Sequence, residues 1–175
     1  MGKAANSSIS LKQIHVTDNF WNKYVHLVKD VIIPYQWDIL NDKLEDVETS
    51  HCIENFKIAA GEKEGEFQGA VFQDTDVAKW LEAVGFVLNY ERDEKLEELA
   101  DETIELIGRA QQPDGYLNTY FTIKEPEHRW QNLLECHELY CAGHMMEAAV
   151  AYYDATGKDK LLKVMEGMAG HIIDR

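Results

Sequence analysis

The stretch LLECHELYCAGHMMEAAVAYY, residues 133–153, gathers two cysteines and two histidines between Cys136 and His144. Thiolates and imidazoles are common zinc ligands, and both side chains also serve as catalytic groups. At about 100° per residue on a helix, His137, Cys141 and His144 share one narrow stripe, whereas Cys136 points away. The histidines of an H-E-x-x-H zinc helix share one face in the same way.

Three interpretations of this stripe are open. A metal site fits the residue types, but an obvious fourth ligand is lacking nearby and the residues between are large and apolar. A core or cavity-facing stripe would make Cys141 a small buried hydrophobe and leave a histidine bonded to a neighbour. The remaining interpretation is a sugar-binding or catalytic histidine that lines a cavity.

Two further segments carry polar groups next to helices. In VFQDTDVAKW, Gln73 and Asp74 stand where a loop meets a helix, so they can project into a cavity; Asp74 or Asp76 can equally be a plain N-cap. In QQPDGYLNTYF, Tyr116 either faces the same cavity or packs beside a connecting turn. Carboxylates are too plentiful in this chain for any pair to be named acid and base from spacing alone.

The elements that must position these groups are helices. Three-four apolar spacing predicts helices over roughly 76–90, 92–112 and 132–155, and the last of these should stop at Gly157. A final helix follows over 158–175, a shorter one ends at Gly61, and an N-terminal one is capped by Asp18 and kinked or restarted at Pro34. The segment 115–123 has the only β-favouring residues, and we expect a loop or short ribbon there.

An internal repeat organises these helices. Shifting the segment that begins at Glu82 by 65 residues superposes it on the segment that begins at Glu147, and it aligns Lys95 with Lys160. Each copy reads as one αα-hairpin, and such hairpins must stack to bury their apolar faces. The fold class is therefore all-α, with αα-hairpin repeats. Two clear copies and a less regular N-terminal one are too few to close a ring of six.

The composition argues against some classes of binding partner. The chain has 175 residues, 45% of them apolar, which suits one globular unit with a real core. Its formal charge of −15, from 32 acidic against 17 basic residues, argues against nucleic acids and anionic membranes as partners. The three cysteines form no C-x-x-C pair, so neither a disulfide framework nor a zinc ribbon is indicated.

The N-terminus bears on location. MGKAANSSISLKQIHV has no apolar core of signal-peptide length, and it carries Asn6 where a myristoylation signal wants Ser or Thr. No stretch approaches 18 consecutive apolar residues. We therefore expect a cytoplasmic protein.

Three motifs together resemble a known family. VFQDTDVAKWLEA, AQQPDGYLNTYF and HELYCAGHMMEAAVAYYDATG are similar, in order and spacing, to the N-terminal part of the bacterial β-L-arabinofuranosidases of glycoside hydrolase family 127. VIIPYQWDILND and NFKIAAGE match upstream. The resemblance covers roughly residues 14–175.

The resemblance implies part of an (α/α)6 barrel, or toroid, whose central cavity binds a furanose. It implies retaining hydrolysis that releases β-L-arabinofuranose from plant-derived glycans, with a zinc-bound cysteine as nucleophile and a glutamate as acid/base. His137 matches a histidine that contacts sugar hydroxyls, with Gln73, Asp74 and Tyr116 as further expected sugar contacts. In that pattern Cys141 is not a metal ligand.

The chain departs from the family in its cysteines. Cys52, Cys136 and Cys141 match none of the zinc-binding cysteines, so we expect no catalytic residue and no cofactor here, with zinc belonging to a complete enzyme. Residues 1–175 then form the N-terminal portion of an incomplete catalytic domain that is inactive alone. The alternatives are a stand-alone helical binding or assembly module and, more remotely, a zinc hydrolase built on the histidine stripe. An open barrel edge exposing Met165, Met168, Ile172 and Ile173 predicts self-association.

Overall fold

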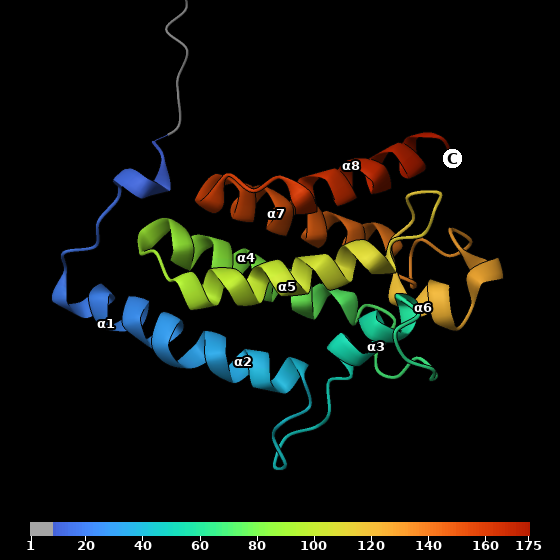
Figure 1. The fold of residues 1–175 in the computed structure, drawn as a ribbon, viewed down its shortest axis with the longest axis horizontal. Coiled ribbons are helices and arrows are strands. Elements are labelled where there is room, and N and C mark those ends of the chain that lie inside the picture. The colour runs from blue at the N-terminus through green and yellow to red at the C-terminus, as the bar shows by residue number, and fades with distance from the viewer. Residues whose placement is uncertain (1–8) are drawn as a thin grey trace, which may run out of the picture.

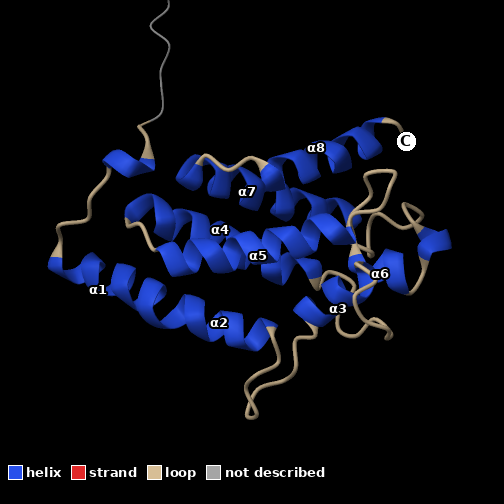
Figure 2. Cartoon of the chain, in the orientation of Figure 1, coloured by secondary structure: helices blue, strands red, loops and turns tan. Residues whose placement is uncertain are grey.

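A computed structural model describes residues 9–175 (Figure 1). Every regular element in that range is helical (Figure 2), which confirms the predicted all-α class. The α-helices are α1 Asn19–Leu27, α2 Ile33–Leu40, α3 Cys52–Ala59, α4 Asp74–Tyr90, α5 Glu94–Ala110, α6 Thr119–Ile123, α7 Glu138–Thr156 and α8 Lys160–Ile173. Two 3₁₀ turns, Leu11–Gln13 and Pro126–His128, and one π-helical turn, Val28–Ile32, complete them. The myristoylation position, Asn6, lies outside the described residues.

The first two helices form one bent rod. Asp18 caps α1 by accepting hydrogen bonds from the N–H groups of Phe20 and Trp21 at 2.8 and 2.9 Å. A π-helical turn then precedes α2, which carries Pro34 in its first turn. Because proline has no N–H to donate, the helix restarts there, as the sequence predicts.

The repeat corresponds to two stacked hairpins, α4–α5 and α7–α8. A shift of 65 residues carries α4 onto residues 139–155, which is α7 to within a residue at each end. α7 ends as predicted at Gly157, which adopts a left-handed φ of 76° and donates its N–H to the carbonyl of Tyr153. Figure 1 shows the two hairpins side by side, and α4 with α7 is the most extensive helix contact in the described part.

Large buried side chains join the hairpins to their neighbours. The Trp80 indole of α4 donates to the carbonyl of Ile33 at 3.1 Å and fastens α4 to α2. The Tyr152 hydroxyl of α7 donates to the Asp101 carboxylate at 2.7 Å and fastens α7 to α5. α4 thus contacts α2 as well as α7, and its first turns position the candidate site.

Two predicted elements differ from the structure. The segment predicted as a loop or ribbon contains α6, because Asn118 caps a short helix by accepting from the N–H of Phe121. Met165 and Met168 do not belong to an exposed edge: both are buried in the core, Ile172 is half-buried, and of these four residues only Ile173 is open, at 81%. None of the helices between residues 9 and 175 has the length and apolar character that crossing a membrane requires.

Candidate functional site

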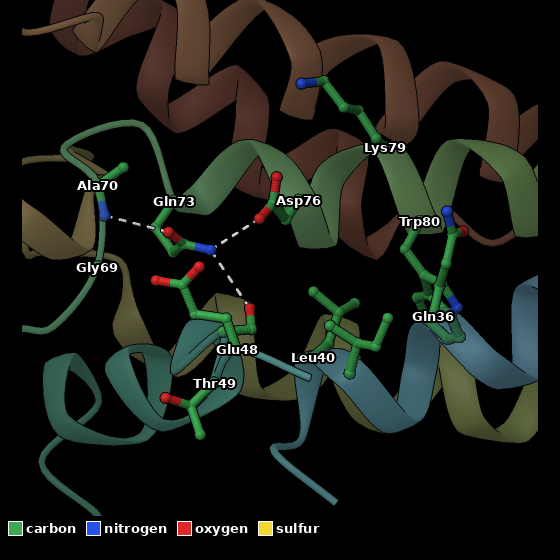
Figure 3. Close-up of a pocket in the computed structure, with 12 residues that line it drawn as sticks. Gln36, Leu40, Glu48, Thr49, Gly69, Ala70, Gln73, Asp76, Lys79 and Trp80 are labelled. Atoms are coloured by element: carbon green, nitrogen blue, oxygen red, sulfur yellow. Dashed lines mark hydrogen bonds between the residues drawn. The ribbon is translucent and has the colours of Figure 1, made fainter. Parts of the chain in front are cut away.

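A cavity of 630 Å³ opens between α2, α4 and the two loops that precede α4. Its lining includes Ser50 from the loop before α3. Gln36 comes from α2, Gln73 from the N-cap position of α4, and Asp76 and Lys79 from the first turns of α4 (Figure 3). Segments distant in sequence thus converge here. Their side chains supply both hydrogen-bond donors and acceptors, which is the equipment a polyhydroxylated ligand needs.

The amide of Gln73 is fixed at this cavity by three hydrogen bonds. Its Oε1 accepts from the N–H of Ala70 at 3.1 Å, and its Nε2 donates to Ser50 Oγ at 3.3 Å and to Asp76 Oδ2 at 2.7 Å (Figure 3). Gly69 makes room for it, because a Cβ at that position would lie 2.7 Å from Gln73 Oε1. Gln73 therefore lines this cavity with its amide held by protein groups, and its predicted contact with a sugar stays a prediction.

Asp76 and Lys79 follow Gln73 at helical spacing on the same face of α4. Burial raises the pKa of Asp76, while nearby Lys79 opposes that rise. The Lys79 ammonium donates to Tyr140 Oη of α7 at 3.3 Å and to Thr75 Oγ1 at 3.3 Å. The polar face of α4 therefore continues from the cavity onto α7.

His137 lies just before α7 and not within it. The helix begins at Glu138, and His137 adopts a left-handed φ of 56°. The predicted stripe of His137, Cys141 and His144 is wrong for this reason, since it assumed one helix from residue 132. The imidazole Nδ1 of His137 instead lies 2.6 Å from the carbonyl oxygen of Glu135.

The surroundings of His137 nevertheless connect it to the polar face. Its ring centroid lies 5.3 Å from that of Phe72, next to the cavity loop, and 5.7 Å from that of Tyr140. Tyr140 in turn contacts Lys79. His137 is thus at the rim of the face that carries Lys79, and its predicted contact with a sugar stays a prediction.

Asp74 is turned away from the cavity. It is the first residue of α4, is 5% exposed, and accepts hydrogen bonds from the backbone N–H of Thr119 at 2.7 Å and from the Thr119 hydroxyl. It is not the N-cap that spacing allowed, because Gln73 occupies that position and makes no side-chain cap. These contacts give Asp74 a structural role that joins α4 to α6; its contact with a sugar stays a prediction.

Tyr116 is fully buried beneath α7. Its hydroxyl donates to Glu138 Oε1 at 2.5 Å, and Glu138 Oε2 accepts from the N–H of Trp130 at 2.7 Å. The chain makes a turn just before it, in which Gly115 donates its N–H to the carbonyl of Gln112. The packed-aromatic interpretation of Tyr116 therefore describes its position, and its contact with a sugar also stays a prediction.

Residues 13–175 match the family described as "Beta-L-arabinofuranosidase, GH127 catalytic domain". The chain belongs to glycoside hydrolase family 127. The match to this GH127 domain spans both hairpins, the cavity and His137.

Individual GH127 proteins are also similar to this chain in sequence and structure. It is 40% identical over 172 residues to a non-reducing end β-L-arabinofuranosidase of Bifidobacterium longum, covering 89% of this chain and 26% of that protein. It is 61% identical, with a TM-score of 0.90, to the crystal structure of a GH127 β-L-arabinofuranosidase from Geobacillus stearothermophilus T6, covering 91% of this chain and 25% of that one. A second GH127 β-arabinofuranosidase structure has 32% identity and a TM-score of 0.86 over 95% and 27% of the two chains.

The predicted part of an (α/α)6 barrel is confirmed by the fit of its hairpins to these solved structures. The chain spans about a quarter of the length of the relatives it matches. The likeness is therefore to one portion of them.

The zinc-bound cysteine chemistry that the resemblance implies does not fit the described residues. Burial raises the pKa of Cys52, Cys136 and Cys141, whereas a zinc ligand or nucleophile needs a thiol that ionises readily. Within residues 9–175, the one cluster of ligand-type side chains close enough to hold an ion contains no cysteine. These three cysteines are therefore poorly suited to hold zinc or to act as the nucleophile.

The sequence alone did not predict that Gln36, Ser50 and Lys79 line the cavity. Gln73, Asp76 and Lys79 follow one another at three-residue intervals, which places them on one helix face. This spacing could have predicted that Lys79 lines the same cavity as Gln73. Ser50 gave no such signal, because it reaches Gln73 only through the folding of a loop 23 residues earlier.

Proposed function

We propose that residues 1–175 are the N-terminal portion of a GH127 catalytic domain and carry part of its β-L-arabinofuranose site. Plant-derived glycans are the proposed source of that sugar. Family membership supports the substrate class, as do two β-L-arabinofuranosidase relatives at 40% and 61% identity. In this proposal the chain binds and orients the sugar, while a retaining displacement by a nucleophile needs groups outside the described residues.

The observation that carries the proposal is the fixed amide of Gln73 at the cavity. Its three partners hold the amide in one orientation, so little side-chain entropy is lost when a ligand binds. Asp76 offers a carboxylate acceptor and Lys79 an ammonium donor on the same face of α4. A furanose presents hydroxyls that both donate and accept, and this set of groups complements them.

A binding titration tests the proposal. We expect methyl β-L-arabinofuranoside to shift the backbone amide NMR signals of residues 69–76 in a saturable manner. Gln73→Ala should weaken this binding by about two- to tenfold, because it removes a hydrogen bond of about 0.5–1.5 kcal/mol to the sugar. Gln13→Ala, which changes an exposed glutamine outside the cavity, is the matched control and should leave the affinity unchanged.

Two results would contradict the proposal. One is the absence of saturable shifts at residues 69–76 while the chain remains folded by circular dichroism. The other is equal affinity in the Gln73→Ala and Gln13→Ala variants, which would remove the cavity amide from the site. A response to methyl β-D-xylopyranoside of the same strength would show that the cavity does not select a furanose.

A helical assembly module is the second candidate, and one observation favours it. Phe20, Trp21 and Tyr24 of α1 form an exposed aromatic cluster with ring centroids 5.1 to 6.0 Å apart. Exposed apolar patches of this kind mark surfaces that another protein covers.

The cytoplasmic location stays a prediction.

A further inference from the structure

Three side chains on the facing surfaces of α4 and α7 converge at a place the sugar proposal does not use. They are Glu82 of α4, and His144 and Glu147 of α7. One ligand-type atom from each lies within 4.8 Å of the other two. His144 Nδ1 is 3.1 Å from Glu147 Oε2.

The repeat explains why two carboxylates meet here. Glu82 and Glu147 are equivalent in the two hairpins, separated by the 65-residue offset. α4 and α7 run in the same direction, because their contacts advance together along both helices. Lys79 of α4 contacts Tyr140 of α7, and two turns further on Gly85 of α4 meets Ala151 of α7. The two helices approach closely at Gly85, so equivalent positions lie next to each other across the contact.

The charges at this place are not balanced by protein cations. Among the described residues, no lysine or arginine forms an ion pair with Glu82 or Glu147, and the side chain that faces Glu147 is His144. Lys79, one turn away on α4, is bonded to Thr75 and Tyr140. Two adjacent carboxylates without a cation repel each other, and a bound cation would relieve that repulsion.

The imidazole of His144 is already oriented toward the carboxylates. Its side chain is 23% exposed, and the ring of Tyr140 packs edge-on against it at 4.5 Å. Its Nδ1 is shielded from solvent and makes no hydrogen bond of good geometry, although it faces Glu147. A fixed imidazole nitrogen without a hydrogen-bond partner is a ready metal ligand.

We propose that Glu82, His144 and Glu147 bind a divalent transition-metal cation of the zinc class and so link α4 to α7. One imidazole nitrogen and two carboxylate oxygens are a ligand set that Zn²⁺ accepts, and bundle metal sites are built from such residues on facing helices. Metal bonds of about 2.0–2.2 Å bring ligand atoms to roughly 3 Å apart. Glu147, whose side chain is 62% exposed, is free to rotate by that amount.

Metal titration of the full chain tests this proposal. After treatment with EDTA, the chain should bind one Zn²⁺ by isothermal titration calorimetry, and Co²⁺ should give visible absorption bands of a nitrogen–oxygen site. Glu82→Gln and His144→Ala should each weaken Zn²⁺ binding at least tenfold. Glu98→Gln, which neutralises an exposed glutamate on α5, is the matched control and should bind as the unchanged chain does.

The outcomes separate clearly. Loss of binding in Glu82→Gln and His144→Ala, with retention in Glu98→Gln, supports the site. The proposal is overturned if the unchanged chain binds no Zn²⁺, or if both variants bind it as tightly as the control, since the ion would then sit on other ligands. Glu82→Gln keeps the side-chain shape, so circular dichroism should show an intact fold and tie any loss to the ligand itself.

Discussion

Gly85 of α4 lies directly against the backbone of Ala151 in α7. A Cβ placed on Gly85 would be 2.8 Å from the carbonyl carbon of Ala151 and 2.9 Å from its oxygen. No side chain fits between the two helices at this point. The closeness of the two repeats, on which the polar face of α4 and α7 depends, therefore requires glycine here.

Gly85→Ala should destabilise the fold. The added methyl group forces apart two helices that meet through backbone atoms, and overpacking of this kind costs about 1–3 kcal/mol. Gly143→Ala in α7 is the control, because nothing lies within 4 Å of its Cβ position and alanine favours a helix by about 1 kcal/mol. Urea unfolding should show opposite shifts for the two variants; a neutral Gly85→Ala would contradict the close contact.

Tyr116→Phe should lower stability through Glu138. The buried carboxylate would keep its bond from the Trp130 N–H and lose the one from the Tyr116 hydroxyl. A buried group left without a partner costs about 1–3 kcal/mol. Tyr153 lies on α7, as Glu138 does, but its ring is half-exposed. Tyr153→Phe should therefore change the free energy of unfolding little. Equal effects of the two substitutions would show that the Glu138 contact is unimportant.

Asp74 should make stability fall as the pH rises. Burial raises its pKa from 3.8 to about 6, outweighing the two hydrogen bonds from Thr119. The folded chain therefore holds a proton that the unfolded chain releases near pH 4, and this stabilisation is lost as the pH rises through about 6. Between about pH 4 and 7, the free energy of unfolding should fall by up to about 3 kcal/mol relative to Asp74→Asn. Parallel pH profiles would contradict this direction.

The chain should self-associate through α1 and not through α8. Trp21 is 61% exposed within the aromatic cluster, whereas the methionines of α8 are buried. In sedimentation equilibrium, we expect Trp21→Ser to reduce concentration-dependent association and Ile173→Ser to leave it unchanged. The reverse result would show that the chain associates through α8. A strict monomer would show that it associates through neither helix.

Residues 1–175 alone should show no arabinofuranosidase turnover. A cysteine nucleophile requires a thiol of low pKa or an adjacent base, and burial raises the pKa of Cys52, Cys136 and Cys141 instead. The measurement is L-arabinose release from a β-linked substrate over many hours. Steady release that Cys141→Ser abolishes would refute this expectation.

The sequence by itself determined the helices and their repetition. Apolar spacing, the cap at Asp18, the break at Pro34 and the stop at Gly157 act over a few residues, so they are readable locally. The 65-residue offset likewise predicted the two hairpins. Gln73 and Asp74 stand at the same junction before α4, yet only Gln73 lines the cavity, so their position in the sequence did not separate them.

Only the tertiary structure decided how the polar groups pair. The left-handed backbone at His137 delays the start of α7 and removes His137 from the predicted stripe. Asp74 finds Thr119 45 residues away, and Glu82 meets His144 across the contact between the hairpins. Periodicity shows which side of a helix is polar but not which neighbour faces it, because that depends on how closely the helices pack. Here a glycine at position 85 sets that distance.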